Sequence, residues 1–169
     1  MTSHTMRILG IDPGLQITGY GCVDLAEGTI DPTLVEAGVF RLNVKRNMAF
    51  RLAQLHEDLS AVLRDLKPQR MVVEQLYSHY RHARTSILMG HARGVVLLAG
   101  QLQNIEISEL ASTEVKKAVT GHGHATKRQM QLAVMSQCNL SELPTPPDVA
   151  DAIAIALCEA RREATEAIA

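Results

Sequence analysis

The chain has 169 residues, of which 46% are hydrophobic and 21% are charged, and its formal net charge is −1. This composition is typical of a globular protein with one ordinary domain and a buried core. It excludes a membrane-spanning protein, because apolar stretches such as residues 95–99 are far shorter than the ~20 residues that cross a bilayer.

The N-terminus and the cysteines favour a cytoplasmic protein. The first residues, MTSHT, have neither the basic start nor the apolar stretch of a secretory signal. The three cysteines are scattered without CxxC spacing, which favours reduced thiols over a disulfide framework. We expect residues 1–5 to form a disordered extension and residues 6–169 to form one domain.

Three strands are expected first, at residues 7–12, 18–24 and 36–42. The turn residues Pro13 and Gly14 join the first two strands. A second turn, at residues 31–32, precedes the third strand. Connections this tight predict an antiparallel meander.

Helices and strands then alternate. Asn47 is a candidate N-cap for a helix whose leucines keep helical spacing as far as Pro68. The remaining expected elements are a strand at 70–76, a helix at 85–103, a strand at 105–110, a short helix from Ser112 or Thr113 to Gly121, and helices at 126–138 and 148–164. A basic loop is expected at 77–84 and a flexible loop at 121–125. This order predicts an α/β fold with a mixed five-stranded sheet flanked by helices.

Four carboxylates are candidate metal ligands. Asp12 ends the apolar first strand and Glu74 interrupts the apolar fourth, whereas Asp148 and Asp151 lie on one face of the last helix. Ordinary explanations are a turn cap for Asp12, an ion pair for Glu74 and helix-dipole complementarity for the two aspartates. Because an unpaired charge in an apolar strand is costly, we favour a site for two Mg²⁺ ions roughly 3.5–4 Å apart, which activate water in phosphodiester cleavage.

Charge is distributed unevenly along the chain. Residues 67–128 contain nine Lys or Arg against four acids, whereas from Glu142 onward six acids face two arginines. A neutral total can therefore hide a basic face that a polyanion would meet, although a solvated run of charge explains the same pattern.

Five blocks, in order along the chain, resemble the RuvC family of Holliday-junction resolvases: GIDPGLQITGYG, VVEQLY, GHARGV, VKKAVTGHGHATK and DVADAIAIA. The resemblance covers residues 6 to about 160. It implies an RNase H-like fold and a homodimeric, Mg²⁺-dependent endonuclease, with Mn²⁺ as an alternative cation. Such an enzyme cuts two opposed strands of a four-way DNA junction symmetrically, in recombination and repair. The implied partner is a branch-migration complex of the RuvA and RuvB type.

Within this resemblance, the positions of Asp12, Glu74, Asp148 and Asp151 match the family's metal-binding acids, although some members carry histidine in place of Asp148. Lys116 and Lys127 match basic residues near the scissile phosphate, and Tyr77 matches an aromatic residue that stacks on junction bases. Stacking of this kind is typically worth ~1–3 kcal/mol. Further candidate DNA contacts are Arg81, Arg84, Lys117, Gly121, Gly123 and Arg128. His122 and His124 are expected to face DNA or solvent rather than a metal.

The helix at 85–103 is apolar on more faces than a simple surface helix needs. One face would pack on the sheet and another on a second copy, which suits an enzyme that makes two cuts related by a two-fold axis. Complete burial within one chain is the alternative.

Three other functions compete with a junction nuclease. A phosphotransferase of the actin and sugar-kinase superfamily also opens with a strand, an Asp and a glycine hairpin, but Tyr20 stands where a phosphate-loop lysine is needed. That superfamily also clamps nucleotide between two domains, and this chain is long enough for one. A binding module for branched DNA would not need all four acids. A nuclease of the same fold acting on RNA would not need the Tyr77 loop.

Overall fold

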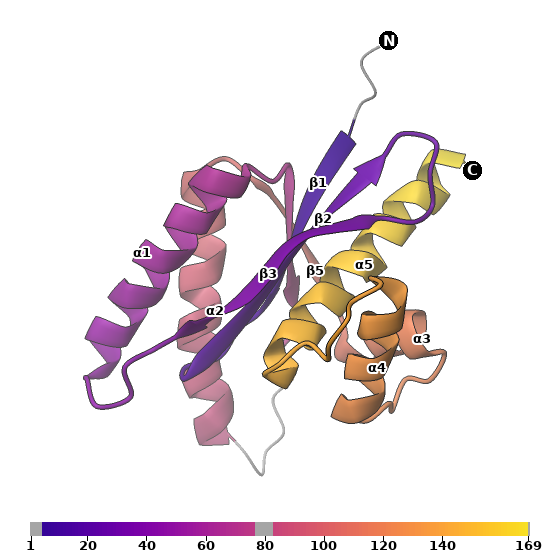
Figure 1. Cartoon of the computed structure of the whole chain (residues 1–169). Helices are drawn as coiled ribbons and strands as arrows, with labels where there is room; N and C mark the ends of the chain where they lie inside the picture. Colours follow the sequence, from indigo (N-terminus) through magenta and orange to yellow (C-terminus); the bar gives the residue numbers. More distant parts are fainter. Residues whose placement is uncertain (1–4, 77–82, 169) are drawn as a thin grey trace.

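The computed structural model describes residues 5–76 and 83–168, and its centre is a five-stranded sheet (Figure 1). The strands are β1 (Thr5–Asp12), β2 (Ile17–Ala26), β3 (Thr33–Arg41), β4 (Arg70–Glu74) and β5 (Glu106–Leu110), arranged in the order β3-β2-β1-β4-β5. The first three pair antiparallel, and β4 and β5 add in parallel. The expected mixed sheet with an N-terminal meander is confirmed.

Several strand boundaries differ from expectation by one to three residues, and two of the differences matter for the N-terminus and the site. Thr5 pairs with Ala26, so it belongs to the sheet rather than to the expected extension. Strand β4 ends at Glu74 instead of Leu76, which places Glu74 at the strand end, as Asp12 is. The predicted DNA contacts Tyr77 and Arg81 lie outside the described residues.

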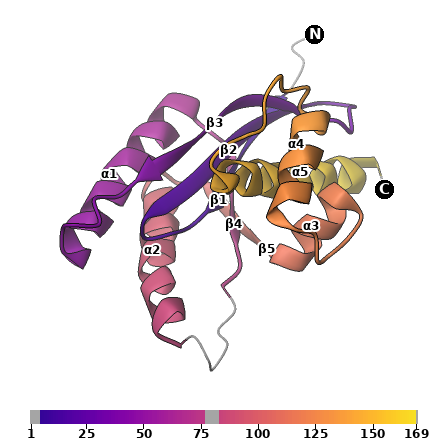
Figure 2. The same cartoon turned by 60° about the horizontal axis from the view of Figure 1, so that its bottom comes forward.

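Five helices cover the two faces of the sheet. They are α1 (Met48–Leu66), α2 (Ala83–Leu102), α3 (Ser112–Thr120), α4 (Lys127–Gln137) and α5 (Pro147–Ile168). Figures 1 and 2 show α1 and α2 on one face and α3, α4 and α5 on the other. None of the helices in the described part of the chain is long and apolar enough to cross a membrane. All three cysteines are free.

The alternation of side chains along the strands divides the core in two. Ile8 faces the layer of α3, α4 and α5, whereas its neighbour Leu9 faces the layer of α1 and α2. The Asn47 side chain caps α1 by accepting a hydrogen bond from the Phe50 amide at 2.9 Å, as expected. Helix α2 begins at Ala83, so Arg84 lies in its first turn and not in the preceding loop.

Glycines allow α5 to lie unusually close to the sheet. At Gly10, Gly19 and Gly21 an added Cβ would lie 2.7 Å from a backbone atom of α5: Ala156 N, Asp148 C and Ile153 Cα, respectively. Real Cβ atoms do not tolerate such approaches. The glycines therefore set the separation between β1, β2 and the helix that carries two of the candidate metal ligands.

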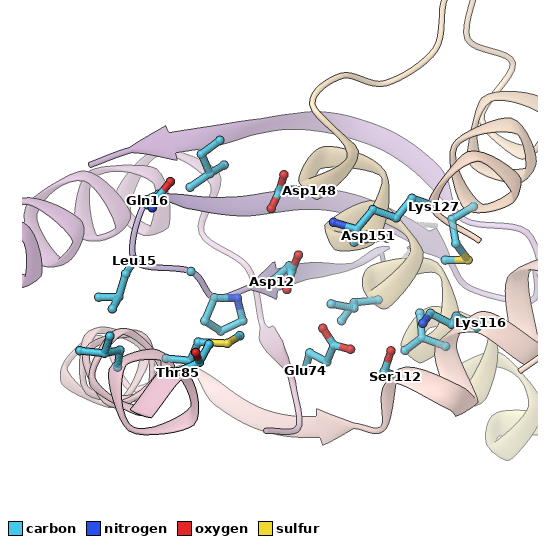
Figure 3. A pocket seen from close by; sticks show the side chains of 18 of the residues that line it. Asp12, Leu15, Gln16, Glu74, Thr85, Ser112, Lys116, Lys127, Asp148 and Asp151 are labelled. Carbon is cyan, nitrogen blue, oxygen red and sulfur yellow. The ribbon is translucent and has the colours of Figure 1, made fainter. Parts of the chain in front are cut away.

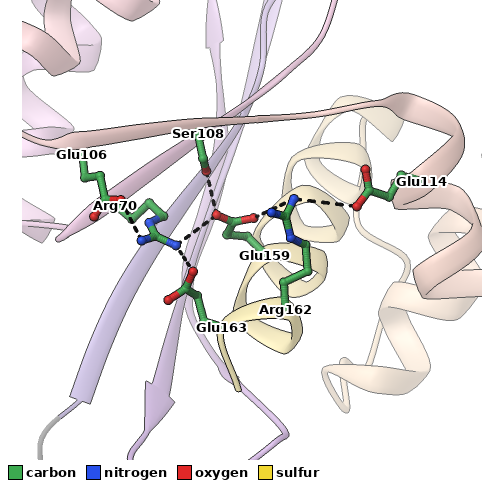
Figure 4. Close-up of polar contacts among 7 residues, drawn as sticks. All are labelled: Arg70, Glu106, Ser108, Glu114, Glu159, Arg162 and Glu163. Atoms are coloured by element: carbon green, nitrogen blue, oxygen red, sulfur yellow. Dashed lines mark hydrogen bonds and ion pairs between the residues drawn. The ribbon is translucent and has the colours of Figure 1, made fainter. Parts of the chain in front are cut away.

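A buried ionic cluster holds the far part of α5 on the sheet (Figure 4). The Glu159 side chain is only 2% exposed. It accepts a hydrogen bond from the Ser108 hydroxyl at 2.7 Å and one from Arg70 at 3.2 Å. Arg70 also pairs with Glu106 at 2.8 Å and with Glu163. The cluster joins β4, β5 and α5 where a charge would be costly if left alone.

Removing the arginine should therefore destabilise the fold. We expect Arg70→Met to lower the free energy of unfolding by about 3 kcal/mol, because the Glu159 carboxylate stays buried without its closest cation. Urea unfolding followed by circular dichroism measures the loss. The double variant Arg70→Met/Glu159→Leu should recover much of it, and a double variant less stable than the single one would contradict this explanation.

Candidate active site

Two parallel strands place Asp12 and Glu74 side by side. Strands β1 and β4 are neighbours, and Ile11 is paired with Val73. The next residue of each strand is the carboxylate, at a strand separation of roughly 4.8 Å. Because parallel strands end at the same edge of a sheet, both side chains emerge at this edge.

The first turns of α5 bring the other two acids to the same edge. Gly19 pairs with Asp12 on β1 and lies directly against the backbone of Asp148. Asp151 follows one turn later on the same helix. Figure 3 shows all four carboxylates around one cavity. They line it together, and its volume is about 870 Å³. The acids come from three elements and converge only in the fold.

Lysines border the same cavity. Lys116 on α3 and Lys127, the first residue of α4, both line it, and Figure 3 shows Lys127 beside Asp151. The position of Lys127 is fixed by its own helix start, where Thr126 and Gln129 form a reciprocal capping box. Arg84 also lines the cavity. The site therefore presents acids at its centre and cations on its wall.

Burial makes these carboxylates hard to ionise in the absence of a cation. Burial, then the negative charges of Glu74 and Asp151, raises the pKa of Asp12 to about 8. Burial likewise raises the pKa of Asp151 to about 6, against the opposing effect of Lys127. A divalent cation among them would remove this cost, and carboxylates are the hard oxygen ligands that Mg²⁺ prefers.

The four candidate metal ligands are spread around the cavity. In residues 5–76 and 83–168, no three His, Cys, Asp or Glu side chains form a group that could hold a metal ion by themselves. The four acids are instead spread around a cavity with room for water and a phosphate group. This arrangement fits hard cations that keep several waters and complete their coordination with substrate oxygens.

Other predicted contacts lie outside the cavity lining. Lys117 and Arg128 are exposed on α3 and α4. Gly121 ends α3 with a φ of 78°, a conformation that favours glycine irrespective of any ligand. His122 and His124 are exposed, with ring centres 6.0 Å apart. Gly123 lies between them and does not line the cavity either.

Comparison with known proteins identifies the family. The model of the family "Crossover junction endodeoxyribonuclease RuvC" matches residues 8–159. The chain belongs to the RuvC family. It is 46% identical to the Rhodopirellula baltica member over 89% of this chain and 84% of the relative. It is 40% identical to the Desulforamulus reducens member over 95% and 96%.

Solved structures agree with this assignment. Thermus thermophilus RuvC in complex with a Holliday junction substrate superposes with a TM-score of 0.85, 31% identity and coverage of 95% of this chain and 96% of that one. The yeast mitochondrial Holliday junction resolvase, at 15% identity and a TM-score of 0.67 over 95% and 81%, shares the fold. The expected RNase H-like fold is confirmed. RuvC membership favours the nuclease over the phosphotransferase and the binding module.

Among the residues that line this RuvC site without having been predicted from the sequence, three stand out. Ser112 stands between Glu74 and Lys116 in Figure 3, at the step from β5 into α3. Arg51 on α1 lines the cavity and donates to the Leu15 carbonyl, through Nε at 3.1 Å and through Nη2. Met48, one turn earlier on α1, lines it too. Arg41, Lys45 and Arg46, just before α1, are a signal in the sequence that could have pointed to the α1 side of the cavity.

Proposed function

We propose that this RuvC family protein is a divalent-metal-dependent endonuclease that resolves four-way DNA junctions by symmetric paired nicks, in recombination and repair. The observation that carries the proposal is the convergence of Asp12, Glu74, Asp148 and Asp151 on one cavity bordered by Lys116 and Lys127. The likeness to a RuvC solved with a Holliday junction supports the choice of substrate. Residues 6–169 act as one nuclease domain in this proposal, in a cytoplasmic protein.

The four carboxylates would hold the cations, with two Mg²⁺ ions as the preferred set and Mn²⁺ as the alternative. When bound, such ions activate a water and stabilise the leaving oxygen of the cut strand. The chain itself fixes the geometry: the strand ends orient Asp12 and Glu74, and the close packing of α5 orients Asp148 and Asp151. Lys116 and Lys127 attract the phosphate and hold its non-bridging oxygens.

A homodimer would supply the second cut. Helix α2 buries Ala92, Val96 and Ala99 against the rest of the fold. On its outer side, Ile87, Leu98 and Leu102 are 64%, 52% and 64% exposed. This exposed apolar face supports a symmetric dimer through α2. Sedimentation equilibrium should therefore give a dimer mass, and a concentration-independent monomer would contradict it. A branch-migration complex of the RuvA and RuvB type is the proposed partner in the cell.

The proposal is tested with a labelled synthetic four-way junction, a linear duplex and a single strand, each with and without Mg²⁺. Paired, symmetric nicks in the junction that need the cation support it. Tight junction binding without nicks under Mg²⁺ or Mn²⁺ would favour a recognition module. Absence of both binding and cleavage would favour the phosphotransferase instead.

Lys116→Ala should slow the chemical step at saturating enzyme by about 10²-fold, because a cation at the reacting phosphate is lost. It should also flatten the dependence of log affinity on log salt by roughly 0.9. Lys117→Ala is the matched control, since Lys117 is exposed on the same helix and does not line the cavity. The rate of single-turnover cleavage is measured for both variants and for the wild type. Equal rates for the two would remove Lys116 from the site.

A further inference from the structure

The segment between β3 and α1, with the first turn of α1, is a basic stretch of the surface near the cavity, separate from the one that holds Lys116 and Lys127. Residues 37–56 contain four Lys or Arg and no Asp or Glu, although the whole chain has a net charge of −1. Arg41, Lys45 and Arg46 are exposed, and Arg51 is partly buried. None of these four residues is among the DNA contacts predicted from the sequence.

Apolar groups are interspersed with these cations. Val44 is 57% exposed. Phe50 is 40% exposed, whereas the other phenylalanine of the chain, Phe40, is 7% exposed. The guanidinium carbon of Arg46 lies 3.9 Å from the centre of the Phe50 ring. A cation stacked on an exposed ring offers charge to phosphate and a flat face to a sugar or base, which is the combination used by surfaces that bind single strands.

This surface is continuous with the cavity. Met48 and Arg51 line the cavity from the first turn of α1. Arg51 also holds the Leu15 carbonyl, and the Leu42 amide donates to the Gln16 carbonyl at 2.9 Å. The turn after β1 and the segment before α1 therefore form one wall. Figure 3 shows Leu15 and Gln16 at one end of the cavity and Lys116 and Lys127 at the other, with the carboxylates between them.

The backbone under these side chains is well ordered by hydrogen bonds. The Lys45 amide donates to Asn43 Oδ1 at 3.1 Å, and the Arg46 amide to the Asn43 carbonyl at 3.0 Å. The Asn43 amide in turn donates to Gln54 on α1 at 3.2 Å. A surface fixed in this way loses little conformational entropy when it binds a charged strand.

We propose that Lys45, Arg46 and Phe50 form a DNA subsite that binds the strand flanking the cut, on the opposite side of the carboxylates from Lys116 and Lys127. Lys45 and Arg46 contact phosphates, and the Phe50 ring faces a sugar or a base. A strand whose scissile phosphate lies at the carboxylates is then held at both ends of the cavity. The inference rests on the proposed junction-nuclease function and adds a second binding region to it.

The test compares Lys45→Gln/Arg46→Gln with Arg64→Gln. Arg64 is exposed near the other end of α1, 13 residues or about 20 Å from Arg51, and takes no part in the proposed site. Junction affinity is measured over a range of salt concentrations in Ca²⁺, with thermal unfolding and sedimentation as checks on fold and assembly. We expect the double variant to bind roughly 10-fold more weakly, with a salt slope lower by about 1.8, from two phosphates at roughly 0.9 each. Arg64→Gln should bind as the wild type does.

A phosphate-by-phosphate experiment locates the subsite. Junctions carrying one neutral methylphosphonate at successive positions beside the cut should lose affinity for wild type at one or two positions. The double variant should be insensitive at those same positions, since the effects of two partners in contact are not additive. Phe50→Leu should weaken binding while leaving the salt slope unchanged, because it removes a flat ring and no charge.

The outcomes separate this inference from the function on which it rests. A wild type that cleaves junctions, together with a double variant of unchanged affinity and slope, overturns the subsite and leaves the nuclease intact. A folded double variant that has lost its dimer would show that the segment contacts a second copy of the chain, which also overturns the subsite. A wild type that neither binds nor cuts junctions removes both proposals.

Discussion

Asp12→Asn is expected to abolish junction cleavage, by about 10³-fold or more, while junction affinity stays within about threefold of wild type. Asparagine keeps the shape of the side chain and removes the charge that would hold a cation between β1 and β4. Binding depends mainly on cationic side chains such as Lys116 and Lys127, which the substitution leaves in place. Single-turnover cleavage and affinity in Ca²⁺ are measured on the same preparation.

The same variant should not be less stable than wild type when Mg²⁺ is absent. Burial and the neighbouring carboxylates raise the pKa of Asp12, so its charged form is unfavourable in the folded protein without a cation. A neutral amide relieves that cost, and the rise in melting temperature caused by Mg²⁺ should shrink. Asp65→Asn, on the exposed side of α1, is the control and should behave as wild type. Loss of folding or of junction binding in Asp12→Asn would mark the residue as structural.

The sequence sufficed for those parts of the site that depend on strand pattern. Asp12 and Glu74 could be recognised because a carboxylate in an apolar run is costly, and the pairing of β1 with β4 then brings them together. The antiparallel meander likewise followed from short turns. These features are local, or need only one pairing between neighbouring strands.

Other features depend on how each helix is rotated about its axis, because adjacent residues of a helix point their side chains in different directions. Lys116 and Lys117 are one position apart and so lie about 100° apart around α3, and only Lys116 lines the cavity. The same holds for Lys127 and Arg128 on α4. A basic pair in the sequence predicts a cationic helix but not which member faces the acids. That choice is made by the packing of α3 and α4 on α5.

Arg51 illustrates a contact that only the tertiary fold creates. It is 36 residues from Leu15, whose carbonyl it holds, and it reaches the cavity because β3 returns the chain to the edge where β1 ends. Similarly, the sequence did not predict that α2 begins at Ala83, because the residues around this position are compatible with a helix and with a polar loop. Long-range packing decides where local preference is weak.

Gly19→Ala should lower the cleavage rate by about 10²-fold even where the protein remains folded, because displacement of catalytic groups by about 1 Å is sufficient for such a loss. A Cβ at this position would lie 2.7 Å from the carbonyl carbon of Asp148 and overlap its carbonyl oxygen. The first turn of α5 must then move away from β2. Asp148 and Asp151 would move with it, away from Asp12 and Glu74. A higher Mg²⁺ requirement should accompany the slower cleavage.

Gly100→Ala separates this displacement from general instability. Its Cβ would lie 2.5 Å from Met71 Cε and 3.1 Å from Ile107 Cδ1, so it crowds α2 against the sheet and leaves α5 in place. Gly19→Ala and Gly100→Ala should both destabilise the fold, each by about 1–3 kcal/mol, but only Gly19→Ala should raise the Mg²⁺ concentration needed for half-maximal cleavage. The assays are run well below both melting temperatures. If the two variants lose cleavage in proportion to stability and keep the same Mg²⁺ requirement, the glycines serve the fold alone. If Gly19→Ala alone shifts that requirement, the contact between β2 and the first turn of α5 sets the positions of two ligands.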